Sequence, residues 1–100
     1  MAIRIRPDEQ AIRQFCSRWK VTELSLFGSV LRDEFGPDSD VDVLVSFAPD
    51  AHRSLFDLVA MEEELEALFG RKVDLVEAAG LRNPFRRKEI LSSRKVIHAA

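Results

Sequence analysis

The stretch 26-LFGSVLRDEFGPDSDVDVLV-45 holds the residues that decide the fold. One hydrophobic run ends at Gly28 and Ser29, and the next run, DVDVLVSF, carries Asp40 and Asp42 among its valines. Because side chains alternate along a strand, the valines occupy one face and the two aspartates share the other. Their Cβ atoms would then lie roughly 6.5 to 7 Å apart, a costly pairing unless a cation or a proton lies between the carboxylates.

Hydrophobic periodicity predicts the helices that flank this stretch. Apolar residues recur every three or four positions in segments 7–20 and 55–69, which is the helical spacing. The first helix is expected to begin at Pro7, whereas Ser54 and Gly70 suit the two ends of the second. The predicted buried stripes are Ile12, Phe15, Cys16 and Trp19 in the first helix and Leu55, Leu58, Val59, Leu65, Leu68 and Phe69 in the second.

Alternating residues predict strands at 22–27, 40–47 and 72–77, with a short helical turn at 30–35. Asn83 and Pro84 suit the start of a last short helix, and the final KVIHAA segment fits either a strand or a frayed tail. The order of elements predicts an α/β (α+β) fold, in which a single small mixed β-sheet has helices packed on one side. Residues 1–100 are expected to form one domain.

The composition limits the classes of function. Fifteen basic and seventeen acidic residues argue against a purely electrostatic nucleic-acid binder, so stable DNA binding is not expected. The basic stretch 82–95 is interpreted as a solvated helix face in preference to a phosphate-binding patch. The single cysteine, Cys16, fits a reducing compartment, and the first ten residues lack a signal-peptide core. Since no apolar run approaches the roughly 20 residues of a membrane span, a cytoplasmic protein without membrane attachment is expected.

The aspartates predict a metal site. Asp40 and Asp42 are rigidly held, because the flanking Val41 and Val43 anchor the opposite face of the strand. Rigid, oxygen-only and doubly negative ligands suit Mg²⁺, with substrate phosphates filling other coordination positions. If the strand 72–77 is adjacent, Asp74 adds a third carboxylate and the site can hold two ions, as in displacements at phosphorus. The sequence alone does not fix that strand pairing.

The glycine–serine turn predicts the complementary anion site. Gly28 lets the backbone approach a phosphate closely, and the Ser29 hydroxyl and Arg32 would face the same anion. The plainer alternatives are an ordinary turn, an acidic surface loop, and exposed ion pairs of the arginine with its acidic neighbours. A calcium loop is excluded, because Val43 and Pro49 stand where it needs glycine and glutamate. The combination of turn, spacing and strand favours the functional interpretation.

This combination resembles the G-S-x-x-R…S-D-x-D signature of the DNA polymerase β-like nucleotidyltransferase superfamily. The short chain and the segment KVDLV are similar to its minimal nucleotidyltransferases, the MNT or MntA-like proteins. The resemblance implies a polymerase β-like nucleotidyltransferase core, two Mg²⁺ ions, and ATP or another NTP as substrate. Gly28 and Ser29 would hold the triphosphate, Asp40 and Asp42 would ligate both metals, and Asp74 would complete the catalytic-metal site.

The same resemblance implies a partner. Minimal members resemble antitoxins that transfer AMP to a tyrosine of a small helical HEPN ribonuclease toxin, so protein adenylyltransfer is the leading hypothesis. The chain is too short to carry a separate acceptor domain, so the acceptor brings its own surface or a homo-oligomer shares one. Two alternatives stay open: a non-catalytic antitoxin that acts by complex formation, and nucleotide transfer to RNA or a small molecule.

Overall fold

The computed structural model of the chain describes residues 7–31, residue 36 and residues 39–99. Its strands are β1 (Val21–Phe27), β2 (Val41–Phe47), β3 (Val73–Glu77) and β4 (Lys95–Ala99). Its α-helices are α1 (Glu9–Trp19), α2 (Leu55–Phe69) and α3 (Pro84–Ser93), and two short 3-10 helices are η1 (Gly28–Leu31) and η2 (Ala78–Gly80). No helix in these described ranges is long and apolar enough to cross a membrane.

The strands form one mixed sheet in the order β3-β2-β1-β4. The central strand β1 is antiparallel to both of its neighbours, whereas β2 and β3 run parallel. The parallel pair is joined through α2, which is the crossover connection that parallel strands require. The predicted mixed sheet is confirmed, and the C-terminal segment is a strand because it completes the sheet beside β1.

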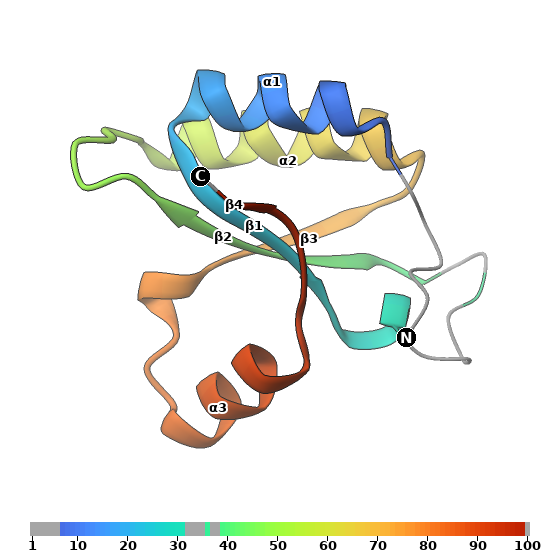
Figure 1. The fold of residues 1–100 in the computed structure, drawn as a ribbon, viewed down its shortest axis with the longest axis vertical. Coiled ribbons are helices and arrows are strands. Elements are labelled where there is room, and N and C mark those ends of the chain that lie inside the picture. Colours follow the sequence, from blue (N-terminus) through green and yellow to red (C-terminus); the bar gives the residue numbers. More distant parts are fainter. Residues whose placement is uncertain (1–6, 32–35, 37–38, 100) are drawn as a thin grey trace.

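Two helical layers cover the sheet unequally (Figure 1). Helices α1 and α2 share one face, where the valines of β2 pack with Phe15, Met61 and Leu65 in the main core. Helix α3 lies beyond the opposite face, where Ile90 packs with Phe27 and Leu44 in a smaller cluster. The prediction that the helices pack on one side of the sheet is therefore correct for α1 and α2 and wrong for α3. The second face also carries apolar side chains, and α3 buries them.

Side-chain caps set where the helices begin. Helix α1 starts after Pro7, because Asp8 is the cap and its carboxylate accepts the amide of Gln10 at 3.1 Å. The predicted start at Pro7 is thus wrong by two residues. Ser54 forms the expected capping box with Asp57, and Asn83 and Pro84 begin α3 as predicted.

The predicted stripe of α2 is correct except at Leu55 and Val59. Leu65 and Phe69 are buried together with Met61, whereas Leu55 is 75% exposed and Val59 49% exposed. Leu55 lies in the first turn of the helix, before the residues that contact the core. Val59 is turned about 100° from Leu58, which does pack on the core, so it faces away.

Candidate active site

One row of residues crosses three strands on the α3 side of the sheet. Phe27 of β1 is the register partner of Asp42 on β2, and Asp42 is the register partner of Asp74 on β3. Register partners in adjacent strands point to the same face of a sheet. Since Phe27 packs in the cluster beneath α3, both aspartates lie on that face as well. The structure therefore brings Asp42 and Asp74 together. The sequence analysis expected this arrangement if the two strands were neighbours.

Gly28 follows this row directly and touches Asp42. Its φ of +74° lies in the left-handed region, which L-residues with a side chain adopt at a cost. A Cβ atom built on Gly28 would lie 2.2 Å from Oδ2 of Asp42. The absence of a side chain at residue 28 thus provides the space that the Asp42 carboxylate occupies. This is a stronger requirement for glycine than the close approach of a phosphate alone.

Asp40 lies just before β2 and is exposed. The chain that leads into it is tied down, because the guanidinium of Arg71 donates to the carbonyl oxygens of Gly36 and Ser39. The amide of Val41 also donates to the carbonyl of Lys72 at 2.8 Å. These contacts fix the start of β2 against the start of β3, so the backbone at Asp40 is held beside the strand that carries Asp74.

The donors at this end of the sheet fit a divalent cation. Asp40, Asp42 and Asp74 offer only carboxylate oxygens, the ligands that Mg²⁺ prefers. Within the described part of the chain, no three acidic, histidine or cysteine side chains are close enough to hold an ion on their own. Mg²⁺ is commonly bound through one or two carboxylates together with water and substrate phosphates, so a partial protein set is what such a site needs.

An open cleft of about 330 Å³ lies beside this row. One wall is formed by Phe27, Gly28 and Asp42, and the other is formed by α3, through Arg86, Glu89, Ile90 and Ser93. Sequence reasoning missed this second wall, because segment 82–95 was interpreted as a solvated face. The available signal was the spacing of these four residues, which places them on one side of a helix.

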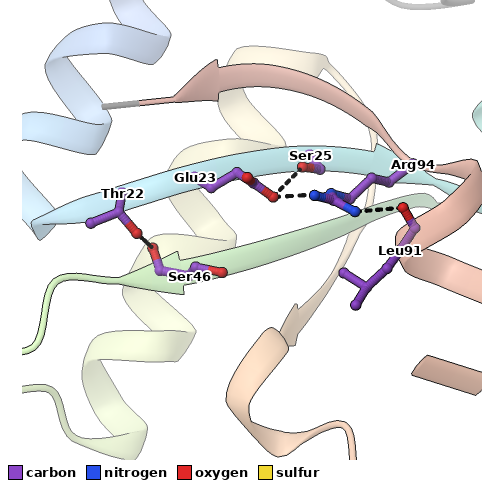
Figure 2. A network of polar contacts seen from close by, with 6 residues as sticks. All are labelled: Thr22, Glu23, Ser25, Ser46, Leu91 and Arg94. Atoms are coloured by element: carbon purple, nitrogen blue, oxygen red, sulfur yellow. Dashed lines mark hydrogen bonds and ion pairs between the residues drawn. The ribbon is translucent and has the colours of Figure 1, made fainter. Parts of the chain in front are cut away.

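A polar network ties the end of α3 to the sheet (Figure 2). Nε of Arg94 donates to Oε2 of Glu23 at 3.0 Å, and the same carboxylate oxygen accepts the hydroxyl of Ser25, which is fully buried. The guanidinium of Arg94 also donates to the carbonyl of Leu91, so it joins α3 to β1. The second wall of the cleft is thus fixed by a partly buried ion pair as well as by Ile90.

Three further residues were assigned or rejected as site residues from the sequence: Ser29, Arg32 and Cys16. Ser29 lies in η1, directly after Gly28, by the course of its backbone. Arg32 falls outside the described residues. Cys16 is buried in the main core, and loss of solvation raises the pKa of its thiol to about 12. It is therefore protonated at neutral pH and is not a nucleophile, in agreement with its predicted role in the core.

Comparison with known proteins gives consistent matches. A family model described as the Nucleotidyltransferase domain matches residues 8–97. Protein adenylyltransferase MntA of Thermococcus cleftensis is 42% identical over 71 residues, which are 71% of this chain and 70% of that protein. The matched family segment includes the whole row from Phe27 to Asp74 and the second wall of the cleft.

Solved structures show the same fold. One that its name classes provisionally as a minimal nucleotidyltransferase is 36% identical, covers 87% of this chain and 86% of its own, and superposes with a TM-score of 0.71. Another is a complex of a tri-AMPylated Shewanella oneidensis HEPN toxin with an MNT antitoxin. The match to it covers 92% of this chain and 70% of that one, with a TM-score of 0.65 at 18% identity, so it speaks for the fold alone.

Proposed function

The chain belongs to the nucleotidyltransferase domain family, and from this premise we propose that it is a Mg²⁺-dependent adenylyltransferase that moves AMP from ATP to a hydroxyl of a protein partner. The observation that carries the proposal is the register of Asp42 with Asp74, where Asp42 also touches the left-handed Gly28 and lines the cleft. A glycine turn and paired carboxylates on neighbouring strands supply the two halves of a site for a metal-bound nucleotide.

Each residue has a distinct role in this proposal. Asp40 and Asp42 hold two divalent ions, and Asp74 completes the ligands of one of them. Bound there, the ions neutralise the polyphosphate and ease the ionisation of the acceptor hydroxyl. The backbone at Gly28 and Ser29, with Arg32, holds the triphosphate. Residues 1–100 act as one minimal domain.

The reaction is a displacement at the α-phosphorus. The acceptor oxygen forms a bond to the α-phosphorus, and the bond from that phosphorus to the oxygen bridging to the β-phosphate breaks. Pyrophosphate leaves with the bonding pair, and the proton of the acceptor hydroxyl passes to the carboxylate of Asp74 or to water beside it. The contribution of the chain is orientation, because the carboxylates of neighbouring strands fix where the attacking and leaving oxygens lie.

The proposed acceptor is a hydroxyl on a small helical HEPN toxin, which would make this chain its antitoxin. The support comes from the relatives: one is named a protein adenylyltransferase, and a structural neighbour is a complex of an AMPylated HEPN toxin with its antitoxin. The cleft is partly open to solvent, as a site that must admit a protein side chain requires.

The test is a transfer assay with ATP labelled at the α-phosphate, Mg²⁺ and lysate of the host. Wild-type protein should label one small protein, and Asp42→Asn should reduce that labelling by at least about a hundredfold, since removing a metal ligand removes transition-state stabilisation. A matched control is Asp50→Asn, because Asp50 is exposed and pairs with Lys20 far from the cleft. Its labelling should stay within about twofold of wild type.

Two other outcomes would point elsewhere. If the partner copurifies and is neutralised equally by wild type and by Asp42→Asn, with no label in either lane, the chain acts by capping its partner. If the labelled product survives protease and is destroyed by ribonuclease, the acceptor is RNA. Label that passes a small-pore filter would identify a small-molecule acceptor instead.

A further inference from the structure

The basic residues of α3 differ in what they contact. Nη1 of Arg87 donates to the carbonyl of Ala78 at 3.0 Å, and Arg94 is paired with Glu23, so both guanidinium groups hold the fold together. The side chain of Arg86 makes no hydrogen bond or ion pair with another residue in the described ranges, and it lines the cleft opposite Gly28. The contacts of the fold therefore do not account for Arg86.

The position of Arg86 is set by the helix that carries it. Ile90, four residues later, is only 6% exposed and packs with Phe27 under α3. Residues four apart lie one above the other on a helix, so the anchored Ile90 turns Arg86 toward the same side. The backbone amide of Arg86 is also bound to the cap, because Oδ1 of Asn83 accepts it at 3.2 Å. The side chain of Arg86 therefore starts from the side of α3 that faces the cleft.

Arg86 is the lining side chain that could attract an anion bound in the cleft. Among the described residues that line it, Arg86 is the one cation, and Asp42 and Glu89 are the carboxylates. A polyphosphate bound at the Gly28 turn would need positive charge from metal ions on the side of Asp42. On the α3 side, Arg86 is the described lining residue that can supply positive charge to the phosphates. A planar guanidinium matches phosphate oxygens in pairs.

We propose that Arg86 reaches across the cleft from α3 and binds the polyphosphate of the nucleotide on the side opposite the metal ligands. The inference rests on the proposed function and adds a contact that the Gly28 turn and the aspartates do not provide. As pyrophosphate departs, negative charge grows on its oxygens, so a guanidinium bound to them stabilises the transition state more than the ground state. Arg86 would then affect both nucleotide affinity and turnover.

The test measures binding before catalysis. Calorimetry with Mg²⁺ and α,β-methylene-ATP, which cannot be cleaved at the α-phosphate, is run on wild type, Arg86→Ala, Arg86→Lys and Lys88→Ala. Arg86→Ala should weaken binding about tenfold to a hundredfold, the usual range for a charge-assisted contact. Arg86→Lys should recover part of this loss. Lys88 is exposed on the same helix and does not line the cleft, so Lys88→Ala should change binding by less than about twofold.

Competition with inorganic tripolyphosphate identifies which part of the nucleotide Arg86 contacts. Arg86→Ala should weaken tripolyphosphate and the nucleotide analogue by similar factors. If only the nucleotide is weakened, Arg86 contacts the base or the ribose and the inference is wrong. Equal binding by wild type and Arg86→Ala, with both proteins folded by circular dichroism, would also overturn it.

The outcomes separate this inference from the proposed function. Normal label transfer by wild type, together with binding that is insensitive to Arg86→Ala, leaves the function standing and removes the contact. Nucleotide binding that depends on Arg86, without transfer to any acceptor, keeps the contact and removes the adenylyltransferase. If wild type binds neither the nucleotide nor tripolyphosphate, both proposals fail.

Discussion

At residue 28 the space that a Cβ atom would fill is taken by the carboxylate of Asp42. The backbone is also left-handed there, so two separate requirements exclude a side chain. Gly70 has nearly the same φ, +70° against +74°, but a Cβ atom on it would meet nothing within 4 Å. A comparison of alanine substitutions at Gly28 and Gly70 therefore separates the cost of backbone strain from the cost of displacing Asp42.

We predict that Gly28→Ala and Gly70→Ala share the cost of a left-handed alanine, that Gly28→Ala adds the cost of displacing Asp42, and that the two differ in activity. The shared cost should lower the free energy of unfolding by about 1–2 kcal/mol. Gly28→Ala should also reduce label transfer about a hundredfold, because the Asp42 carboxylate must move by an amount that matters for catalysis. Urea denaturation and the transfer assay measure the two effects.

Gly70→Ala is the control for this prediction, since Gly70 ends α2 and is exposed on the surface. If both variants retained full transfer activity, the position of the Asp42 carboxylate against Gly28 would not matter to the reaction. If both lost activity equally, the loss would come from stability and not from the site.

Among the elements, α3 is the one whose position decides whether the cleft has a second wall. Ile90 packs under the sheet, and Arg94 bonds to Glu23 on β1 (Figure 2), so both residues help to fix the helix. The side chains of Arg94 and Glu23 are 24% and 30% exposed, so water only partly screens the pair. Breaking it also deprives the buried hydroxyl of Ser25 of a well-ordered acceptor.

We predict that Arg94→Met lowers the free energy of unfolding by about 1–3 kcal/mol, the range for a partly buried polar group that loses its partner. It should also weaken binding of α,β-methylene-ATP severalfold, because α3 is less well held. Denaturation and calorimetry measure these changes. Lys95→Met, at the neighbouring exposed residue, should change neither. A variant that is destabilised but binds nucleotide normally would show that Arg94 supports the fold without positioning the wall.

The element boundaries show what local sequence can predict. Ser54 with Asp57 and Asn83 with Pro84 mark the starts of α2 and α3 correctly, because a cap is a local hydrogen bond. The stripe of α2 was less predictable. Leu55 has the right spacing, but burial depends on whether the sheet extends beneath the first turn, and that is a property of the whole fold.

The sequence indicated which residues belong to the candidate site, but it indicated less clearly how the strands and α3 bring them together. A helix between two strands indicates a crossover, and hence the parallel pairing of β2 and β3. The register that opposes Asp42 to Asp74 depends on how α2 packs, which no local pattern encodes. The face of α3 was hidden for a similar reason, because the helix has a run of four charged residues, Arg86–Glu89, and Ile90 is its one buried residue.

At the scale of the whole molecule, the sheet separates two apolar clusters of unequal size. The larger lies under α1 and α2, whereas the smaller consists of Phe27, Leu44, Leu81 and Ile90. Local stability follows the apolar contacts that hold an element, so the α3 layer should open more readily than the rest. The wall of the cleft that α3 forms is therefore less stable than the wall that carries Asp42.

We predict that native-state hydrogen exchange will resolve this difference. Amides of α3 should exchange through an opening that costs less free energy than global unfolding, whereas amides of β1 and β2 should exchange only on global unfolding. Bound α,β-methylene-ATP with Mg²⁺ should slow exchange in α3 if Arg86 holds the nucleotide. Exchange of α3 at the same free energy as β1 would show that the molecule unfolds as one unit.

The pairing of β4 with β1 has a consequence for how the protein is made. Residues 95–99 join Glu23–Leu26 across most of the chain, and Arg94 immediately precedes them. A ribosome synthesises β1 early and releases segment 94–99 last among the described elements. Until then a nascent chain has neither its fourth strand nor the ion pair that holds α3. Nucleotide-binding molecules should therefore appear only after that segment leaves the exit tunnel.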